Sequence, residues 1–269
     1  MENKLKQYKV TILCPGGNDT ALVEGLTSGK DRRLLNDRIM KMFPSVEQIG
    51  FYEYDQGKKE AVLEMAGREF CGNATRSTAW QVLQGQPGTI DIKVSNVANK
   101  LKAGVTESGE AFAQMPIYDD PKYITEDPDK PGNYTVRLEG ITHYLDFNTK
   151  QLEGLTEDQI KEKGMQEIRQ RGLDKEPAAG TIYVKKDNGG YTITPVVYVR
   201  DMDTLYLETA CGSGTAALGL VLALQKGESI KDISIKQPSG LPIKVSVAFD
   251  GKRFGYTQIQ GSIEKLNEK

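Results

Sequence analysis

The chain has 269 residues, with 35 Lys and Arg against 37 Asp and Glu and a formal net charge of −2. Its hydrophobic fraction of 38% is ordinary for a globular protein, and the length suits one large domain or two smaller ones. Because the charges nearly balance and no run of five like charges occurs, we expect neither nucleic acid nor a membrane surface as a partner.

The length of the apolar runs and the number of cysteines further limit the class of protein. The longest apolar stretch, residues 216–224, is too short to span a membrane, and the first ten residues lack the apolar core of a signal peptide. We therefore predict a cytoplasmic protein in which Cys14, Cys71 and Cys211 are free thiols. With His143 as the one histidine and no Cys-x-x-Cys, we predict no metal site.

The first half of the chain shows a regular order of helix and strand patterns around Cys71. A helical pattern is followed by a strand, then by the cysteine, an Ala-containing helix ended by a glycine, another strand and a hairpin. In chain order these segments are 34–42, 49–52, Cys71, 74–84 with Gly85, 90–94, and the pair 101–105 and 111–115. The stretch that follows, residues 119–132, is rich in Pro and charge, which predicts a linker.

The second half repeats this order around Cys211. Its segments are a helix over 155–168, a strand at 179–183, Cys211, a helix over 214–225 closed by Gly227, a strand at 233–236, and a hairpin of 243–247 and 254–259. We therefore predict an α+β fold with two pseudo-symmetric domains, 1–122 and 132–269, each a sheet or barrel wrapped around a central helix. The alternative is a single domain with one mixed sheet, in which the similarity between the two halves is a coincidence.

Each cysteine opens the same pentapeptide pattern, Cys71-Gly-Asn-Ala-Thr75 and Cys211-Gly-Ser-Gly-Thr215. Both patterns fall where a helix begins, so the first backbone amides lack partners inside the helix and can hold a carboxylate. The same position lowers the pKa of a neighbouring thiol. If the halves face each other, two thiols and two helix ends meet at one small cleft.

Two opposed thiols suit proton transfer at a carbon atom. One thiolate removes the α-proton of an amino acid, and the opposite thiol protonates the other face, which inverts the centre. Two other interpretations stay open for the pair, simple packing and a redox couple. We expect Cys14 to be a small buried hydrophobe, Trp80 a core residue, and His143 a packed or hydrogen-bonded residue rather than a base.

At these two motifs the sequence resembles the diaminopimelate epimerase superfamily, whose members racemise or epimerise amino acids without pyridoxal phosphate. The resemblance covers most of the chain and implies a cofactor-free isomerase with Cys71 and Cys211 as its two bases. It also implies that the amides of four residues bind the α-carboxylate and that two further side chains contact the substrate. These are Gly72, Asn73, Gly212 and Ser213 for the amides, and Asn18 and Gln48 for the side chains.

Departures from the epimerase pattern bear on the substrate. Where diaminopimelate epimerases hold a distal carboxylate with Asn and Arg, the resemblance places Glu64, Ile141 and Ala178, and the segment before Cys211 carries Glu208. A distal carboxylate is unfavourable among apolar and acidic groups. We expect Glu47 and Glu64 to line a pocket for an imidazole or cationic side chain instead, and Glu208 to be a further substrate-binding residue.

Four short motifs look closest to histidine racemases within this superfamily. They begin at Glu47, Met65, Cys211 and Gln237. The sequence therefore favours a histidine racemase acting on a small amino-acid substrate, with a homodimer as one expected assembly. The alternatives are a diaminopimelate epimerase and a thiol redox or ligand-binding protein without turnover.

Overall fold

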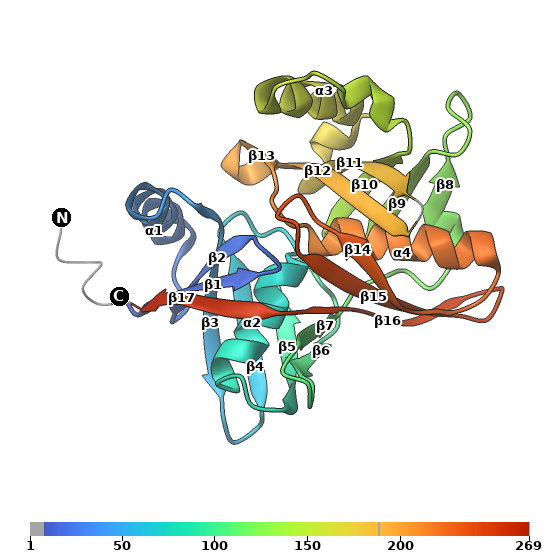
Figure 1. Ribbon diagram of the computed structural model, residues 1–269. Coiled ribbons are helices and arrows are strands. Elements are labelled where there is room, and N and C mark those ends of the chain that lie inside the picture. The colour runs from blue at the N-terminus through green and yellow to red at the C-terminus, as the bar shows by residue number, and fades with distance from the viewer. Residues whose placement is uncertain (1–7, 188, 269) are drawn as a thin grey trace.

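The computed structural model describes residues 8–187 and 189–268 (Figure 1). The first half begins with two strands, and a helix then connects the second of them to the third. Its elements are β1 (Val10–Pro15), β2 (Asp19–Glu24), α1 (Gly29–Met42), β3 (Val46–Asp55), β4 (Glu60–Met65), α2 (Gly72–Val82), β5 (Gly88–Val94), β6 (Leu101–Val105) and β7 (Ala111–Gln114).

The second half has the same plan with longer strands. The stretch expected to be a linker contains the short helix η2 (Pro121–Tyr123) and the strand β8 (Ile124–Glu126). The strand β8 pairs with β9 of the second half. The elements that follow are β9 (Tyr134–Leu138), β10 (Ile141–Asp146), η3 (Thr149–Leu152), α3 (Glu157–Gln170), η4 (Leu173–Lys175), β11 (Ala178–Asp187), β12 (Gly190–Val199), η5 (Arg200–Met202), β13 (Thr204–Leu207), α4 (Gly212–Lys226), β14 (Ile230–Lys236), β15 (Pro242–Phe249), β16 (Phe254–Gly261) and β17 (Ile263–Glu268).

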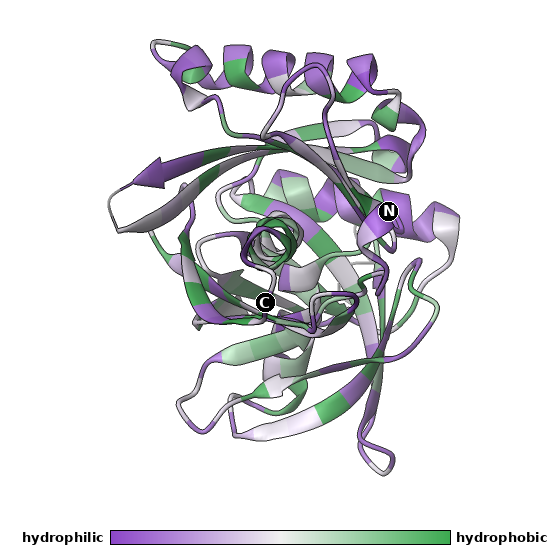
Figure 2. Ribbon diagram, turned by 90° about the vertical axis from the view of Figure 1, so that its right-hand side faces the viewer, coloured by the Kyte–Doolittle hydropathy of each residue, from purple (hydrophilic) through white to green (hydrophobic). Residues whose placement is uncertain are grey.

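Each half wraps its strands around one central helix. The helix α2 contacts β1 to β7, and α4 contacts β9, β10, β12 and β14 to β16. Figure 2 views α4 nearly end-on as an apolar helix surrounded by strands. A helix that is apolar on all sides must be enclosed, and α4 is buried along most of its length. The predicted α+β fold with a helix at the centre of each half is confirmed.

Small residues let the second helix lie close to its sheet. A Cβ atom added to Gly219 would lie 2.6 Å from a methyl carbon of Val245, which is closer than side chains approach one another. The helix ends at Gly227, whose φ of 76° lies in the left-handed region that glycine adopts readily. The glycine expected to close this helix therefore does so.

Strands exchanged between the halves join them into one hydrogen-bonded network. The C-terminal strand β17 pairs antiparallel with β1, and β16 pairs antiparallel with β7. Figure 1 shows β17 running back from the second half to the first. The division at residues 122 and 132 stays a prediction, with β17 as the part of the second half that lies in the sheet of the first.

The segments predicted around the two cysteines match observed elements, whereas several strands lacked a sequence signal. The hairpin of β1 and β2 and the strands β4, β12 and β13 were not anticipated. Most residues of β1 and β2 are buried on both faces, so these strands lack the polar alternation that marks a half-buried strand.

Candidate active site

The two cysteines cap their helices in the same way. Cys71 has φ −130° and ψ 109°, and Cys211 has φ −124° and ψ 107°, both extended. In each case the sulfur accepts a hydrogen bond from the backbone amide three residues later, Ala74 or Gly214, at 3.3 Å. This is the geometry of an N-cap residue, with sulfur in the place usually taken by a side-chain oxygen.

The threonines that end the two pentapeptides repeat the match. Thr75 Oγ1 donates to the carbonyl of Cys71 at 2.7 Å, and Thr215 Oγ1 donates to that of Cys211 at 2.7 Å. Since backbone angles, cap and threonine bond all agree, the two helix starts are equivalent in local structure.

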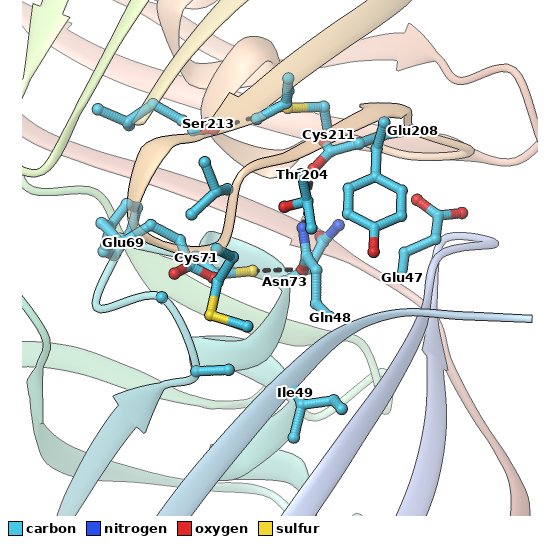
Figure 3. Close-up of a pocket in the computed structure, with 18 of the residues that line it drawn as sticks. Glu47, Gln48, Ile49, Glu69, Cys71, Asn73, Thr204, Glu208, Cys211 and Ser213 are labelled. Carbon is cyan, nitrogen blue, oxygen red and sulfur yellow. Dashed lines mark hydrogen bonds between the residues drawn. The ribbon is translucent and has the colours of Figure 1, made fainter. Parts of the chain in front are cut away.

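Both helix starts open onto one cavity between the halves (Figure 3). Nine of the residues expected in the site line it. They are Glu47, Gln48, Cys71, Gly72, Asn73, Glu208, Cys211, Gly212 and Ser213. The remaining wall is largely apolar, and it includes Ile141, Val197, Val199 and Met202. The fold thus brings together residues that are far apart in the sequence.

Asn18 lies behind this wall rather than on it. It is fully buried, and its Nδ2 donates to Glu47 Oε2 at 2.6 Å. Thr209 also donates to the Glu47 carboxylate, through its hydroxyl and through its backbone amide at 3.3 Å. Burial raises the pKa of Glu47, and these hydrogen bonds act in the opposite direction.

The expectation that Glu64 lines the side-chain pocket is wrong. Glu64 lies on β4, where buried Leu63 and Met65 alternate with more exposed residues, so it points to the opposite face of the sheet. There its carboxylate forms an ion pair with Arg32 and borders a separate surface depression near Arg68. No residue of β4 is among the described residues that line the cavity, and the sequence could not show this.

A hydrogen-bonded bridge connects Cys71 to the other half of the site. The Cys71 thiol donates to Gln48 Oε1 at 2.6 Å, and Gln48 Nε2 donates to Glu208 Oε1 at 2.8 Å. Figure 3 shows Gln48 between these two residues. Glu208 also lies beside Cys211, and burial together with this carboxylate raises the pKa of the Cys211 thiol. Gln48 and Glu208 therefore link the two cysteines.

Cys211 has its own set of neighbours. Its sulfur lies 3.5 Å from Ser213 Oγ, which in turn lies 2.8 Å from His143 Nε2. Burial lowers the pKa of His143 to about 3, so the imidazole is neutral at pH 7. As expected, His143 is a buried, hydrogen-bonded residue, and it supports Ser213 from behind.

Asn73 is held by two partners. Its Nδ2 donates to the carbonyl of Ala210 at 2.9 Å, which ties the start of α2 to the segment before Cys211. Its Oδ1 accepts from the fully buried Arg76, from Nε at 3.3 Å and from Nη2 at 3.2 Å. Burial lowers the pKa of Arg76 to about 10, which leaves the guanidinium charged at pH 7. Our sequence analysis did not single out Arg76.

The charge on the cavity wall is one-sided. Glu47, Glu69 and Glu208 line it, whereas no Lys, Arg or His is among its described lining residues. Burial raises the pKa of Glu69 to about 7 and that of Glu208 to about 8, and it also raises the pKa of the Cys71 thiol. The sequence analysis missed Glu69, although this residue falls inside the motif that begins at Met65. A glutamate two residues before a candidate catalytic cysteine was the available signal.

Two features are absent from the part of the chain that the structure describes, a metal-binding cluster and a membrane-spanning helix. Within residues 8–187 and 189–268, no group of three or more His, Cys, Asp and Glu is arranged to hold a metal ion. In the same residues, no helix is long and apolar enough to cross a membrane.

Comparison with known proteins shows which family this chain belongs to. The family described as "Histidine racemase CntK N-terminal domain" matches residues 7–268. The chain belongs to this family. Two similar proteins are the histidine racemases of Fusobacterium nucleatum subsp. nucleatum, at 29% identity over 89% of this chain and 90% of that one, and of Staphylococcus aureus, at 26% over 93% and 92%.

Solved structures with the same fold are more distant in sequence. A probable proline racemase from Agrobacterium radiobacter K84 superposes with a TM-score of 0.65 at 12% identity, covering 97% of this chain and 92% of that one. A putative phenazine biosynthesis protein from Clostridium difficile gives 0.62 at 13% identity, covering 97% and 98%. Membership of the histidine racemase family confirms the expected resemblance and the expected isomerase class.

Proposed function

We propose that this isomerase racemises histidine, with Cys71 and Cys211 as its two bases. The observation that carries the proposal is the pair of equivalent helix caps, whose sulfurs face one cavity from opposite halves (Figure 3). A racemase must remove a proton from one face of the α-carbon and add one to the other face. Two thiols approaching from opposite sides provide both groups.

The helix starts supply the site for the α-carboxylate. The amides of Gly72, Asn73, Gly212 and Ser213 occupy the first turns of α2 and α4, where backbone donors lack partners inside the helix. Two helix dipoles directed at one carboxylate would also stabilise the negative charge that spreads onto it as the α-proton leaves. The substrate's α-carbon then lies between the two sulfurs.

Proton transfer follows from this placement. One cysteine, as thiolate, takes the α-proton, and the C–H electron pair remains on the substrate as a carbanion. The opposite thiol then gives its proton to the other face. The product leaves with inverted configuration, and the two cysteines have exchanged protonation states. The reverse reaction uses the same residues in the opposite roles, so one residue type suits both positions.

Forming the first thiolate requires help because burial raises the pKa of both thiols. Glu208 lies beside Cys211, so its ionised form, which increases as pH approaches its pKa of about 8, is placed to accept the proton of that thiol. The substrate's α-ammonium brings a positive charge next to the sulfurs and favours their ionised form. We assign Glu208 this acceptor role.

Histidine is favoured by the charges on the wall and by the relatives. Three carboxylates line the cavity, and no described lining residue is a cation that could hold a second substrate carboxylate, as diaminopimelate would need. An imidazole can donate a hydrogen bond to a carboxylate and can also carry positive charge. Both similar proteins named above are called histidine racemases, which supports the same substrate here.

The test is α-proton exchange in heavy water. Purified protein is incubated with L-histidine, and proton NMR follows loss of the α-proton signal while circular dichroism follows loss of optical activity. We expect both signals to decay. The same assay is run with lysine, arginine, ornithine and LL-diaminopimelate.

Two results would reject the proposal. Faster turnover of LL-diaminopimelate than of histidine would favour the epimerase. Absence of exchange with every substrate, together with reversible joining of Cys71 and Cys211 by mild oxidants, would favour a redox protein.

A further inference from the structure

The three carboxylates on the cavity wall differ in how their oxygens are used. Glu47 accepts from Asn18 and Thr209, which bind both of its oxygens. Glu208 accepts from Gln48 and lies beside Cys211. Glu69 differs from both, because its buried Oε2 has no hydrogen-bond partner among the described residues. Of the three, Glu69 has an acceptor left for a ligand.

The surroundings of this oxygen are apolar. A Cβ atom added to Gly67 would lie 2.7 Å from Glu69 Oε2, 2.6 Å from Val199 Cγ1 and 2.9 Å from Met202 Cγ. All four residues line the cavity. Arg32, whose charge acts on Glu69, is paired through Nη2 with Glu64 and forms no ion pair with Glu69. A buried carboxylate oxygen without a donor is unfavourable, so a ligand donor would stabilise it.

Glu69 lies on the Cys71 side of the cavity, two residues before that cysteine. Glu208 and Gln48 bridge the two cysteines, where the α-carbon and its ammonium group belong under the proposed function. The free oxygen of Glu69 lies over Gly67, beside Val199 and Met202 of the apolar wall. A flat aromatic ring can pack against those side chains and direct one N–H toward the carboxylate, whereas a strongly hydrated ammonium group gains less there.

We propose that Glu69 is the specificity-determining residue of the side-chain pocket and accepts a hydrogen bond from a ring N–H of the substrate's imidazole. This inference rests on the proposed function, and it replaces the sequence-based expectation that Glu47 and Glu64 recognise the side chain. Burial raises the pKa of Glu69 to about 7, so near neutral pH the carboxyl and the imidazole can share one proton.

The test compares histidine with thienylalanine, which has a five-membered aromatic ring and no ring N–H. The quantity measured is the ratio of their kcat/KM values for α-proton exchange, in wild type and in Glu69→Gln. A hydrogen bond between a charged group and its partner gives discrimination of about tenfold or more. We expect the wild type to prefer histidine and Glu69→Gln to reduce that preference by about tenfold.

A matched control separates recognition from general damage. Glu64→Gln removes a carboxylate of the same type on the outer face of the neighbouring strand, and it should leave the ratio unchanged. Equal losses of both substrates in Glu69→Gln would mean a structural role or a contact to the α-ammonium, and would overturn the inference.

Binding provides a readout that does not depend on turnover. In the double variant Cys71→Ser and Cys211→Ser, calorimetry compares the affinities of histidine and thienylalanine with and without Glu69→Gln. Loss of the histidine preference on adding Glu69→Gln supports the inference even if the wild type shows no exchange, a result that would count against the proposed function alone. An unchanged preference, or no binding of histidine, would overturn it.

Discussion

The two helix starts at Cys71 and Cys211 share their backbone and differ in their side chains. Both cysteines cap a helix with the same angles, and both carbonyls accept from a threonine hydroxyl. Two positions later, however, Asn73 is supported by the charged Arg76, whereas Ser213 is supported by the neutral His143. Local geometry has been kept while the electrostatic environment has diverged.

This comparison assigns different tasks to the two kinds of interaction. Under the proposed function, the repeated backbone amides bind the substrate's carboxylate, which is the same group in either enantiomer. The divergent side chains make the two thiols chemically unequal, with a guanidinium near Cys71 and the Glu208 carboxylate near Cys211. A racemase with such a site can have pseudo-symmetric binding and still use two bases of unequal strength.

The largest expected effect comes from removing either thiol. Cys71→Ala and Cys211→Ala should each lower histidine racemisation by about a thousandfold or more, because each deletes one of two required proton-transfer groups. Circular dichroism of L- and D-histidine gives the rates. Cys14 is not among the residues that line the cavity, so Cys14→Ala should keep most activity. Activity within tenfold of wild type in either of the first two variants would mean that the cysteines are not both bases.

Glu208→Gln tests the acceptor on the Cys211 side. We expect a loss of about a hundredfold in kcat/KM, as for removal of a general base. The stability of the variant relative to wild type should instead increase as pH rises. Burial raises the pKa of Glu208 to about 8, above about 4.3 in the unfolded chain, so the wild type loses stability as pH rises between those values.

Urea unfolding at pH 5 and pH 8 measures this stability effect. Relative to wild type, Glu208→Gln should become more stable toward pH 8 by a few kcal/mol, since each pKa unit is worth about 1.4 kcal/mol. A constant difference between variant and wild type at both pH values would contradict the shifted pKa.

His143→Gln tests the support behind Ser213. The pKa of His143 is about 3 in the fold, below about 6.5 in the unfolded chain, so the unfolded state binds the proton first as pH falls. Wild type should therefore lose about 2 kcal/mol from this residue between pH 7 and pH 5, and the variant should lack that part of the slope. Equal slopes in urea unfolding would show that the imidazole is not buried in its neutral form.

The smallest expected effect comes from the matched pair Thr75→Val and Thr215→Val. Each removes one hydrogen bond to a cysteine carbonyl, worth about 1 kcal/mol. Thr215 Oγ1 also accepts from Gln237 Nε2 at 3.0 Å, so Thr215→Val should reduce the free energy of unfolding more. A larger loss in Thr75→Val would show that the helix starts differ in stability in a way their local geometry does not indicate.

The sequence by itself determined what depends on neighbours along the chain. The repeated pentapeptide predicts both helix starts and the pairing of Cys71 with Cys211, because the bonds that begin a helix join residues only three or four positions apart. The same short range explains why the glycine after α4 and the two hairpins were predicted.

Only the tertiary structure decided which side chains meet at the cavity. The direction of a strand residue depends on which sheet face packs inward, and this turned Glu64 outward toward Arg32. The bridge from Cys71 through Gln48 to Glu208 joins residues as far as 160 positions apart, and no local pattern encodes it. The unpartnered oxygen of Glu69 is likewise visible only after every neighbouring donor has been placed, because satisfaction of a buried polar atom is a property of the packed fold.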